Sequence, residues 1–326
     1  MPLKSLLRNT VAVSAQFLGQ LGTRERRQRG ALTVLCYHRV LPKSRRQQYF
    51  DRQLVVTPEM FDLHCHVLAK RFEVVPLHTA LANWQQGSTS GKPLAAITFD
   101  DGYRDNETYA APILRRYGLK ATFYVVAGLV GTNEQPWYDR AGQALMYSGK
   151  DAPVEINKAK DMSPSERHTW LRALEAEVPS KQLHDDDLIM DEGALRRLVA
   201  AGHEIGSHTV THPLLDQLDV TRLEDEVQRS KAMLEAASGS KLSGFCYPNG
   251  NMTTAVKAAV AKAGYVYAVS ANPGINRRGN VDRLAVKRWF ISQDRLLTPW
   301  GTPSSALFRA EVTGLAQQVF RRGGTS

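Results

Sequence analysis

Two adjacent carboxylates, Asp100 and Asp101, follow an apolar run at residues 94–99 and stand directly before Gly102. A glycine at that point permits a tight turn, which can present both side chains beyond the end of a strand. Carboxylates placed in this way can bind a metal ion or remove a proton from water. A polar turn that caps a helix has the same composition, so this pattern alone does not separate the two interpretations.

Two histidines, His208 and His212, stand four residues apart after a short strand-like run at 203–206. Imidazoles at this spacing can bind one cation. Together with Asp101 they would form a face of two histidines and one carboxylate, which leaves coordination positions open for water and substrate, as a catalytic metal requires. Without Asp101, two packed or exposed histidines would be the default interpretation of the pair.

Apolar, β-branched runs at 31–38, 94–99, 121–126 and 265–270 alternate with helical patterns along most of the chain. This alternation predicts an α/β fold with a parallel sheet. We expect a distorted (β/α) barrel of about seven parallel strands with a helical insertion, and an open doubly wound sheet is the alternative. In both folds ligands bind at the carboxyl ends of strands, where the acidic pair and the histidines fall.

The expected organisation has three parts. Residues 1–30 form a basic N-terminal segment that we interpret as an amphipathic helix, and residues 31–300 form the catalytic domain with an insertion at about 133–190. Residues 301–326 form a basic, helical C-terminal tail. Within the domain, Thr221 and Glu224 have the spacing of a capping box and predict the start of a helix.

The formal net charge is +10 and its excess lies at the two ends of the chain. Residues 1–30 contain six Lys or Arg against one Glu, and residues 277–326 contain nine against three acidic residues. Such ends can contact an anionic membrane surface, and a solvated basic surface is the simpler interpretation. Nucleic acid is not expected as a partner, because neither end has interleaved aromatic residues or a recognised motif.

The expected location is the cytoplasm or the inner face of the membrane. No apolar run reaches the length of about 18 residues that a membrane span needs, and the N-terminus makes a poor signal peptide, although export stays an alternative. The three cysteines, Cys36, Cys65 and Cys246, have no paired spacing and predict neither a disulfide framework nor a thiolate zinc site.

The stretches Thr98–Gly102 and Ser207–Pro213 resemble the first and second motifs of the polysaccharide deacetylases, carbohydrate esterase family four. The resemblance covers roughly residues 34–286 and includes the linking phrases at 121–126 and 201–206. It implies a divalent metal, zinc before others, and it implies the following roles: Asp100 as catalytic base, and Asp101, His208 and His212 as metal ligands.

The third motif of that family reads arginine, two prolines, tyrosine and glycine, and here Phe245–Gly250 stands in its place. Cys246 replaces the arginine. Asn249 replaces the tyrosine whose backbone N–H helps to hold the oxyanion, so the resemblance implies that Tyr247 and Asn249 face the substrate. Two residues are candidates to supply the missing positive charge to Asp100 from another strand, and both can also be read as surface arginines: Arg283 and Arg288.

The last motif of the family, a Leu-x-His near the C-terminus, cannot exist here because no histidine follows His212. Residues 36–40 read Cys-Tyr-His-Arg-Val and resemble the start of the poly-N-acetylglucosamine de-N-acetylases, in which the motif order is permuted. This implies His38 as the general acid. A capped histidine at a strand end is the alternative for His38.

The expected function is that of a metal-dependent hydrolase that removes N-acetyl groups from the amino sugars of a polysaccharide or other glycan. A second hypothesis keeps the chemistry but takes a lipid-linked or small amino sugar at the cytoplasmic membrane face. A third hypothesis, from another class, is an inactive glycan-binding module on the same fold. The Asp/Asp/His/His set favours an enzyme, whereas the altered third motif favours the inactive module.

Overall fold

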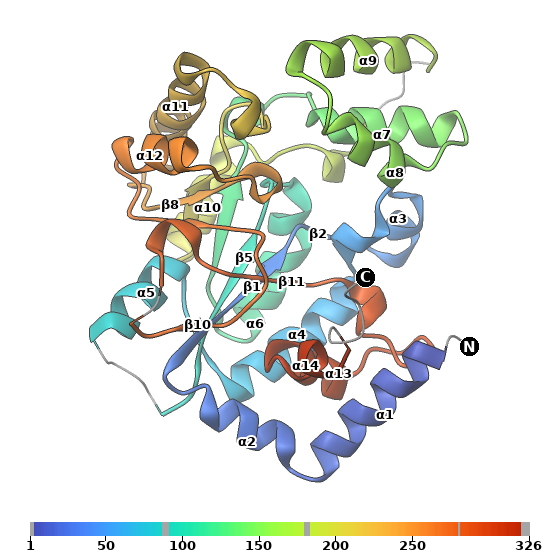
Figure 1. The fold of residues 1–326 in the computed structure, drawn as a ribbon, viewed down its shortest axis with the longest axis vertical. Coiled ribbons are helices and arrows are strands. Elements are labelled where there is room, and N and C mark those ends of the chain that lie inside the picture. Colours follow the sequence, from blue (N-terminus) through green and yellow to red (C-terminus); the bar gives the residue numbers. More distant parts are fainter. Residues whose placement is uncertain (1–2, 87–90, 179–182, 280, 321–326) are drawn as a thin grey trace.

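The computed structural model describes residues 3–86, 91–178, 183–279 and 281–320 (Figure 1). Among these residues a nine-stranded sheet forms the centre, in the order β10-β1-β5-β6-β7-β8-β9, with β11 beside β1 and β4 beside β5. Its strands are β1 (Ala31–Tyr37), β4 (Glu73–Val74), β5 (Leu94–Phe99), β6 (Ala121–Val125), β7 (Glu204–Ser207), β8 (Gly244–Cys246), β9 (Tyr267–Val269), β10 (Asn276–Arg277) and β11 (Trp289–Phe290). A separate pair consists of β2 (Arg39–Val40) and β3 (Val55–Val56).

Every named pairing in the large sheet is parallel except that between β1 and β10. The sheet curls, and residues 286–290 lie between β1 and β9. Val286 forms a parallel bridge with Val269 of β9, and Trp289 pairs with Leu35 of β1. The predicted α/β class and distorted barrel are confirmed.

The described helices are α1 (Leu3–Phe17), α2 (Gln20–Arg27), α3 (Lys43–Gln48), α4 (Pro58–Arg71), α5 (Leu77–Gln86), α6 (Ala111–Arg116), α7 (Trp137–Tyr147), α8 (Ala152–Ala159), α9 (Pro164–Ala176), α10 (Glu192–Ala200), α11 (Val220–Ser238), α12 (Thr254–Lys262), α13 (Ser305–Val312) and α14 (Leu315–Phe320). Several of them begin at a residue whose side chain caps the first turn, such as Thr57, Asp151, Ser163 and Asp191. Thr57 accepts a hydrogen bond from the Met60 N–H ahead of Pro58 at the start of α4.

The predicted capping box at Thr221 and Glu224 is wrong. Helix α11 begins earlier, at Val220, because the Asp219 carboxylate accepts a hydrogen bond from the Arg222 N–H and acts as the N-cap. Aspartate is a better N-cap than threonine, which agrees with a helix that begins after Asp219. The error moves the helix start by two residues, from 222 to Val220, and leaves the fold unchanged.

The strands bury both faces, as expected for a parallel sheet covered by helices. Side chains on the outer face, such as Phe99 and Phe123, pack with the helices in the main apolar cluster. Side chains of the opposite parity, such as Val34, Tyr124 and Val269, fill the inside of the curl. This alternation decides which residues at the strand ends point inward to a shared site.

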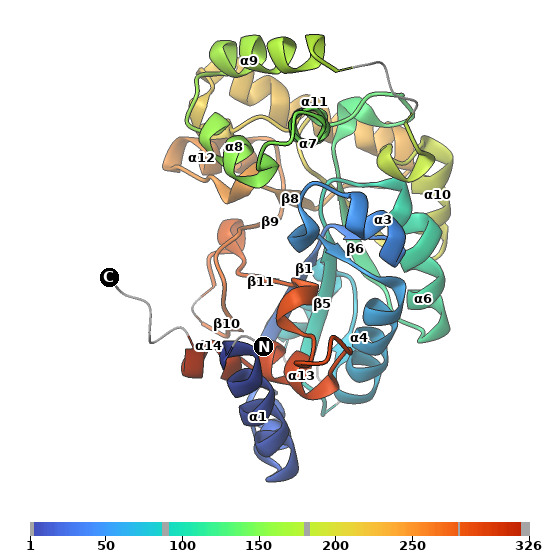
Figure 2. The ribbon, with the colours of Figure 1, turned by 90° about the vertical axis from the view of Figure 1, so that its right-hand side faces the viewer.

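The helical insertion lies between β6 and β7 and includes α7, α8 and α9, which stand together at one end of the sheet (Figure 2). It has its own apolar cluster, to which Leu145, Ile156 and Leu171 belong. At the other side of the molecule, α1 packs against α13, and Glu25 of α2 forms an ion pair with Arg309 of α13 at 2.7 Å. No described helix is long and apolar enough to cross a membrane.

Candidate active site

Three strands deliver polar residues to the same end of the sheet. Strand β5 runs into Asp100 and Asp101, β7 runs into His208, and β1 runs into His38. The strands are parallel, so their carboxyl ends meet at one edge, as the sequence predicted. These four side chains and that of His212 line one cavity of about 420 Å³.

The backbone around the acidic pair is held in an uncommon conformation. Asp101 has φ 73° and Gly102 has φ 84°, so the chain reverses directly after the strand. A Cβ atom on Gly102 would lie 2.8 Å from the Val125 Cγ1 atom, which explains why a glycine stands there. His212 is also left-handed, with φ 58°. Non-glycine residues in this region are concentrated at functional sites in proteins.

Asp101 faces two imidazoles. Its Oδ1 atom lies 3.4 Å from His208 Nε2 and 3.6 Å from His212 Nε2, and the three potential ligand atoms all lie within 4.8 Å of one another. His208 Nδ1 lies 2.8 Å from the Cys246 carbonyl oxygen, which can only accept a hydrogen bond. Nδ1 therefore carries the proton, and in the neutral ring Nε2 directs a lone pair at the carboxylate.

This donor set fits a divalent cation. A lone pair on His208 Nε2 and a carboxylate oxygen at 3.4 Å repel each other unless a positive charge, either a proton or a metal ion, lies between them. Burial would lower the pKa of His208, but the neighbouring Cys246 and Asp101 raise it overall, so this position favours a positive charge. Burial would raise the pKa of Asp101, but the three imidazoles around it, those of His208, His38 and His212, lower that pKa overall. Burial and the adjacent His208 lower the pKa of His212 to about 3, so this ring stays in the neutral form that binds metals.

Asp100, unlike Asp101, forms an ion pair with a buried arginine, Arg288. The guanidinium donates to both carboxylate oxygens, with Nη1–Oδ1 at 2.6 Å and Nη2–Oδ2 at 2.8 Å, and both side chains are buried. Burial alone would raise the pKa of Asp100, but the charge and hydrogen bonds of Arg288 hold it well below its usual value. Asp100 is consequently ionised at neutral pH.

Arg288 lies where the altered third motif leaves space. Its Nη2 atom lies 3.3 Å from the Cys246 sulfur, and its Nη1 and Nε atoms donate to Thr98 Oγ1 and the Ser270 carbonyl at 3.1 Å each. Of the two arginines proposed from the sequence, Arg288 is the one at Asp100. Arg283 lies in η7 (Arg283–Ala285) and is not part of the described cavity lining.

The position of Arg288 follows from the closure of the sheet. Val286 belongs to the cluster inside the curl, and strand residues two apart share a face. Arg288 therefore points inward as well, whereas Arg283 precedes the segment that pairs with β9 and β1. Cys246 itself is buried and reduced, as are Cys36 and Cys65, which agrees with the expectation of free thiols.

His38 stands beside the acidic pair. Its Nε2 atom lies 3.9 Å from Asp100 Oδ2, and its side chain is 19% exposed toward the cavity. The edge of the ring meets Phe290, with the ring centroids 5.6 Å apart. An N-terminal histidine is thus brought into the site even though 61 residues separate it from Asp100 in the chain.

Tyr247 and Asn249 line the cavity from the loop after β8. The Tyr247 hydroxyl donates to the Leu284 carbonyl at 2.9 Å, and burial raises its pKa above the usual range, so the phenol stays neutral. Asn249 has φ 57°, and its side-chain oxygen accepts a hydrogen bond from Lys160 Nζ at 2.8 Å. Because the Asn249 side chain already binds Lys160, the Asn249 backbone N–H is the group that we expect to contact the substrate.

The insertion supplies much of the cavity wall, which the sequence did not reveal. Trp137 and Tyr138 of α7 line the cavity with Ile156 of α8 and with Lys160, and Phe50 contributes from the segment after α3. Tyr138 also packs edge-on against the ligand candidate His212, at a centroid distance of 4.9 Å. The aromatic pair 137–138 was the available signal, but nothing local indicates that the insertion covers the site.

Comparison with known proteins agrees with this geometry. The polysaccharide deacetylase family model matches residues 87–268, which is more than half of the 326 residues. YxkH of Bacillus subtilis (strain 168), which is named as a polysaccharide deacetylase, is 22% identical to this chain. The match covers 76% of this chain and 67% of YxkH.

Two solved structures show the same fold. Deacetylase PplD of Streptococcus pyogenes, in complex with acetate, has a TM-score of 0.59 and 20% identity, and the match covers 81% of this chain and 94% of PplD. IcaB from Ammonifex degensii has a TM-score of 0.59 and 20% identity, and the match covers 88% of this chain and 97% of IcaB. The chain described here belongs to the polysaccharide deacetylase family, carbohydrate esterase family four.

Proposed function

We propose that this protein is a metal-dependent hydrolase that removes N-acetyl groups from the amino sugars of a polysaccharide or other glycan. The observation that carries the proposal is the joint placement of two units in one cavity: the Asp101–His208–His212 face and the Asp100–Arg288 pair. In our assignment a divalent ion, zinc before others, is held by the three-residue face. When bound there it supplies Lewis-acid polarisation of the acetamide carbonyl and lowers the pKa of water.

The protein groups divide the proton transfers between them. Asp100 removes the proton of the attacking water as the new C–O bond forms. A backbone N–H in the Tyr247–Asn249 loop holds the oxyanion that develops on the carbonyl oxygen. His38, as the imidazolium, donates its proton to the amine nitrogen while the C–N bond breaks. Acetate and a free amino sugar are the products.

The same chemistry on a lipid-linked or small amino sugar is the second candidate. The aromatic and apolar cavity wall, which includes Phe50, Trp137 and Ile156, favours a substrate with an apolar part. An inactive glycan-binding module gains less support, since Arg288 restores the positive charge that the third motif lacks.

The test is acetate release from N-acetylated amino sugars offered as a monosaccharide, short oligosaccharides, a polymer and a lipid-linked form. We expect release from at least one of these, loss of release after treatment with a chelator, and its return when zinc is added. Release that survives complete removal of metal would contradict the metal-dependent mechanism. Binding of a glycan without any release would support the inactive module instead.

We also propose that α1 attaches the protein to an anionic membrane surface. One side of α1 packs against α13 through the buried Ala12 and Ala15. Apolar side chains on its other side and just beyond it are exposed: Leu6 (44%), Leu7 (53%), Val13 (47%), Phe17 (89%) and Leu18 (66%). The acidic Glu25 of the following helix is neutralised by Arg309, so the charge that this end presents is positive.

Vesicle co-sedimentation tests this surface. The protein should sediment with vesicles that contain phosphatidylglycerol, and less so with neutral vesicles or at high salt. Phe17→Glu should reduce the bound fraction by about ten-fold, because burial of a phenylalanine contributes roughly 1.5–3 kcal/mol. The control is Val266→Glu, which places the same charge at an exposed apolar residue outside α1 (Val266, 53% exposed). Equal losses in both variants, or a dimer that Phe17→Glu dissociates, would contradict membrane attachment.

A further inference from the structure

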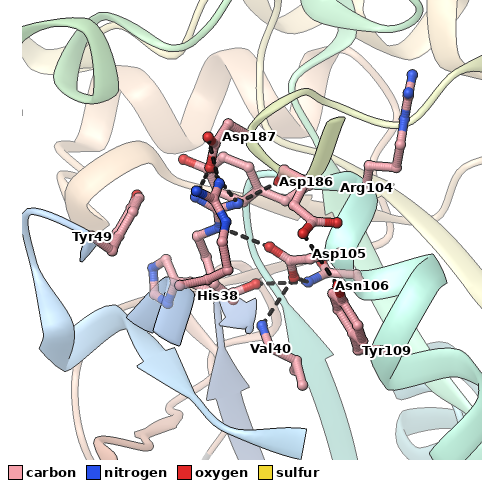
Figure 3. A network of polar contacts seen from close by, with 12 residues as sticks. His38, Val40, Tyr49, Arg104, Asp105, Asn106, Tyr109, Asp186 and Asp187 are labelled. Carbon is pink, nitrogen blue, oxygen red and sulfur yellow. Dashed lines mark hydrogen bonds and ion pairs between the residues drawn. The ribbon is translucent and has the colours of Figure 1, made fainter. Parts of the chain in front are cut away.

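A buried network of charged and polar residues adjoins His38 and includes the next residue in the chain (Figure 3). Arg39 follows His38 in the chain and its side chain is fully buried. Its Nε atom donates to Asp105 Oδ2 at 2.7 Å, and its Nη1 atom donates to Asp187 Oδ1 at 3.2 Å. The guanidinium also packs over the Tyr103 ring, with Cζ 4.2 Å from the centroid. Its charge is thus compensated by partners on two other segments.

Three consecutive residues, His38 to Val40, are bound by two consecutive residues, Asp105 and Asn106. Asn106 Nδ2 donates to the His38 carbonyl at 2.9 Å, and Asp105 Oδ1 accepts from the Val40 N–H at 2.9 Å. Asn106 also donates to Asp105 Oδ1 at 2.8 Å, which joins the two contacts. Figure 3 shows Asp105 and Asn106 facing the chain at His38 and Val40.

The same segment carries the proposed base. Asp105 and Asn106 follow Asp100 by five and six residues, and the Asp100 N–H donates to the Tyr37 carbonyl at 2.9 Å. Residues 37–40 are therefore attached to residues 100–106 at both ends. The pairing of β1 with β5, which runs up to Tyr37 and Phe99, and this attachment together set the relative placement of His38 and Asp100.

The ring of His38 has no equivalent support of its own. Nδ1 is buried and has no hydrogen-bond partner among the described residues, and Nε2 lies 3.9 Å from Asp100 Oδ2, beyond hydrogen-bond length. A ring without hydrogen bonds takes its position from its backbone and from packing. The Asn106 contact to the His38 carbonyl is the nearest polar contact that fixes that backbone.

We infer that Asn106, supported by the Asp105–Arg39 pair, is a positioning residue that holds His38 at the distance from Asp100 that amide cleavage requires. This inference rests on the proposed function, because it matters only if His38 protonates the leaving amine. The competing interpretation is that the network serves stability alone. The two differ in how the loss of Asn106 depends on the leaving group.

A leaving group that needs no proton reports this difference. An amine departs only when it is protonated, whereas an aryl acetate releases a stable phenolate without a general acid. Asn106→Leu keeps about the same volume but removes the donor to His38. We expect kcat for the acetamide to fall by about 10²-fold, which a displacement of about 1 Å can cause, with KM and bound metal unchanged. Aryl acetate hydrolysis should fall by less than about three-fold.

Three further variants complete the experiment. Asn106→Ser, whose shorter side chain cannot span to His38, should show the same selective loss if Asn106→Leu folds poorly. His38→Asn should reproduce the selectivity fully. The matched control is His203→Leu. The buried His203 side chain accepts a hydrogen bond from the Ala121 N–H near the opposite end of the sheet. This variant should lower stability and leave both rates unchanged.

Each result decides between the interpretations. Equal losses of amide and ester turnover in the Asn106 variants, or an unchanged kcat for the amide, would show that the network serves only folding. A His38→Asn variant without leaving-group dependence would instead contradict the general acid of the proposed function. The two failures are distinguishable, since the second appears in His38→Asn itself.

Discussion

Asp101→Ala and Asp100→Asn are expected to lower acetate release strongly, for different reasons. Asp101→Ala removes one of three ligands, so the purified protein should contain no stoichiometric divalent ion. Asp100→Asn keeps the ligand set and removes the base, so metal content should stay at that of the wild type. Its kcat should fall by about 10²- to 10⁴-fold, the usual contribution of a general base.

Metal analysis of the two variants beside acetate assays separates these roles. Asp51→Ala is the control, because Asp51 lines the same cavity but its carboxylate accepts from the Gln53 N–H in a local turn. It should keep both metal and turnover. Near-normal turnover in Asp100→Asn would remove the base assignment, and full metal content in Asp101→Ala would remove the ligand assignment.

Arg288→Met is expected to change the pH dependence of both turnover and stability. In the wild type Arg288 holds the pKa of Asp100 below 3.8, its usual value. The pair therefore stabilises the fold above that value, and the contribution is lost as the pH falls through the lower, folded pKa. Without the guanidinium, burial raises the pKa of Asp100 instead. The variant should be inactive near neutrality and recover in part as the pH rises.

Stability should change in the matching direction. A buried, unpaired carboxylate should cost roughly 3–5 kcal/mol at pH 8, and less at pH 5, where Asp100 of the variant is protonated. Arg288→Lys is the control, because it keeps the charge but loses the bidentate fork. It should fold normally and lose about ten-fold in kcat. Its kcat should still decline only at low pH, where Asp100 becomes protonated. Urea unfolding and kcat profiles over pH 5–9 measure both effects. If kcat of Arg288→Met declined at the same low pH as kcat of the wild type, the role assigned to Arg288 would be wrong.

The network behind His38 was only partly visible in the sequence. The Cys-Tyr-His-Arg-Val stretch indicated His38, but nothing in it predicts that Arg39 is fully buried. A lone arginine beside a strand is usually exposed. Its partners lie 66 and 148 residues away, and the second of them belongs to the end of the insertion. Buried charge of this kind becomes recognisable only when its compensating carboxylates are placed.

Local physics determined the framework and the main chemical residues. Buried strands read as apolar runs, glycine permits the turn after Asp101, and parallel strands end at one edge, so Asp101 and His208 were expected to meet. These features depend on neighbours within a few residues or on a topology that many sequences share. They predicted the α/β class and the candidate ligands, and the resemblance of the two motifs to the polysaccharide deacetylases indicated the family.

Tertiary structure alone decided which arginine serves Asp100 and what encloses the substrate. Arg288 reaches Asp100 across 188 residues, and its inward direction depends on how residues 286–290 pair with both ends of the curled sheet. The wall formed by Trp137 and Lys160 depends on where the insertion packs. Such contacts join segments whose relative placement is set by the packing of the whole molecule, and no local periodicity encodes them.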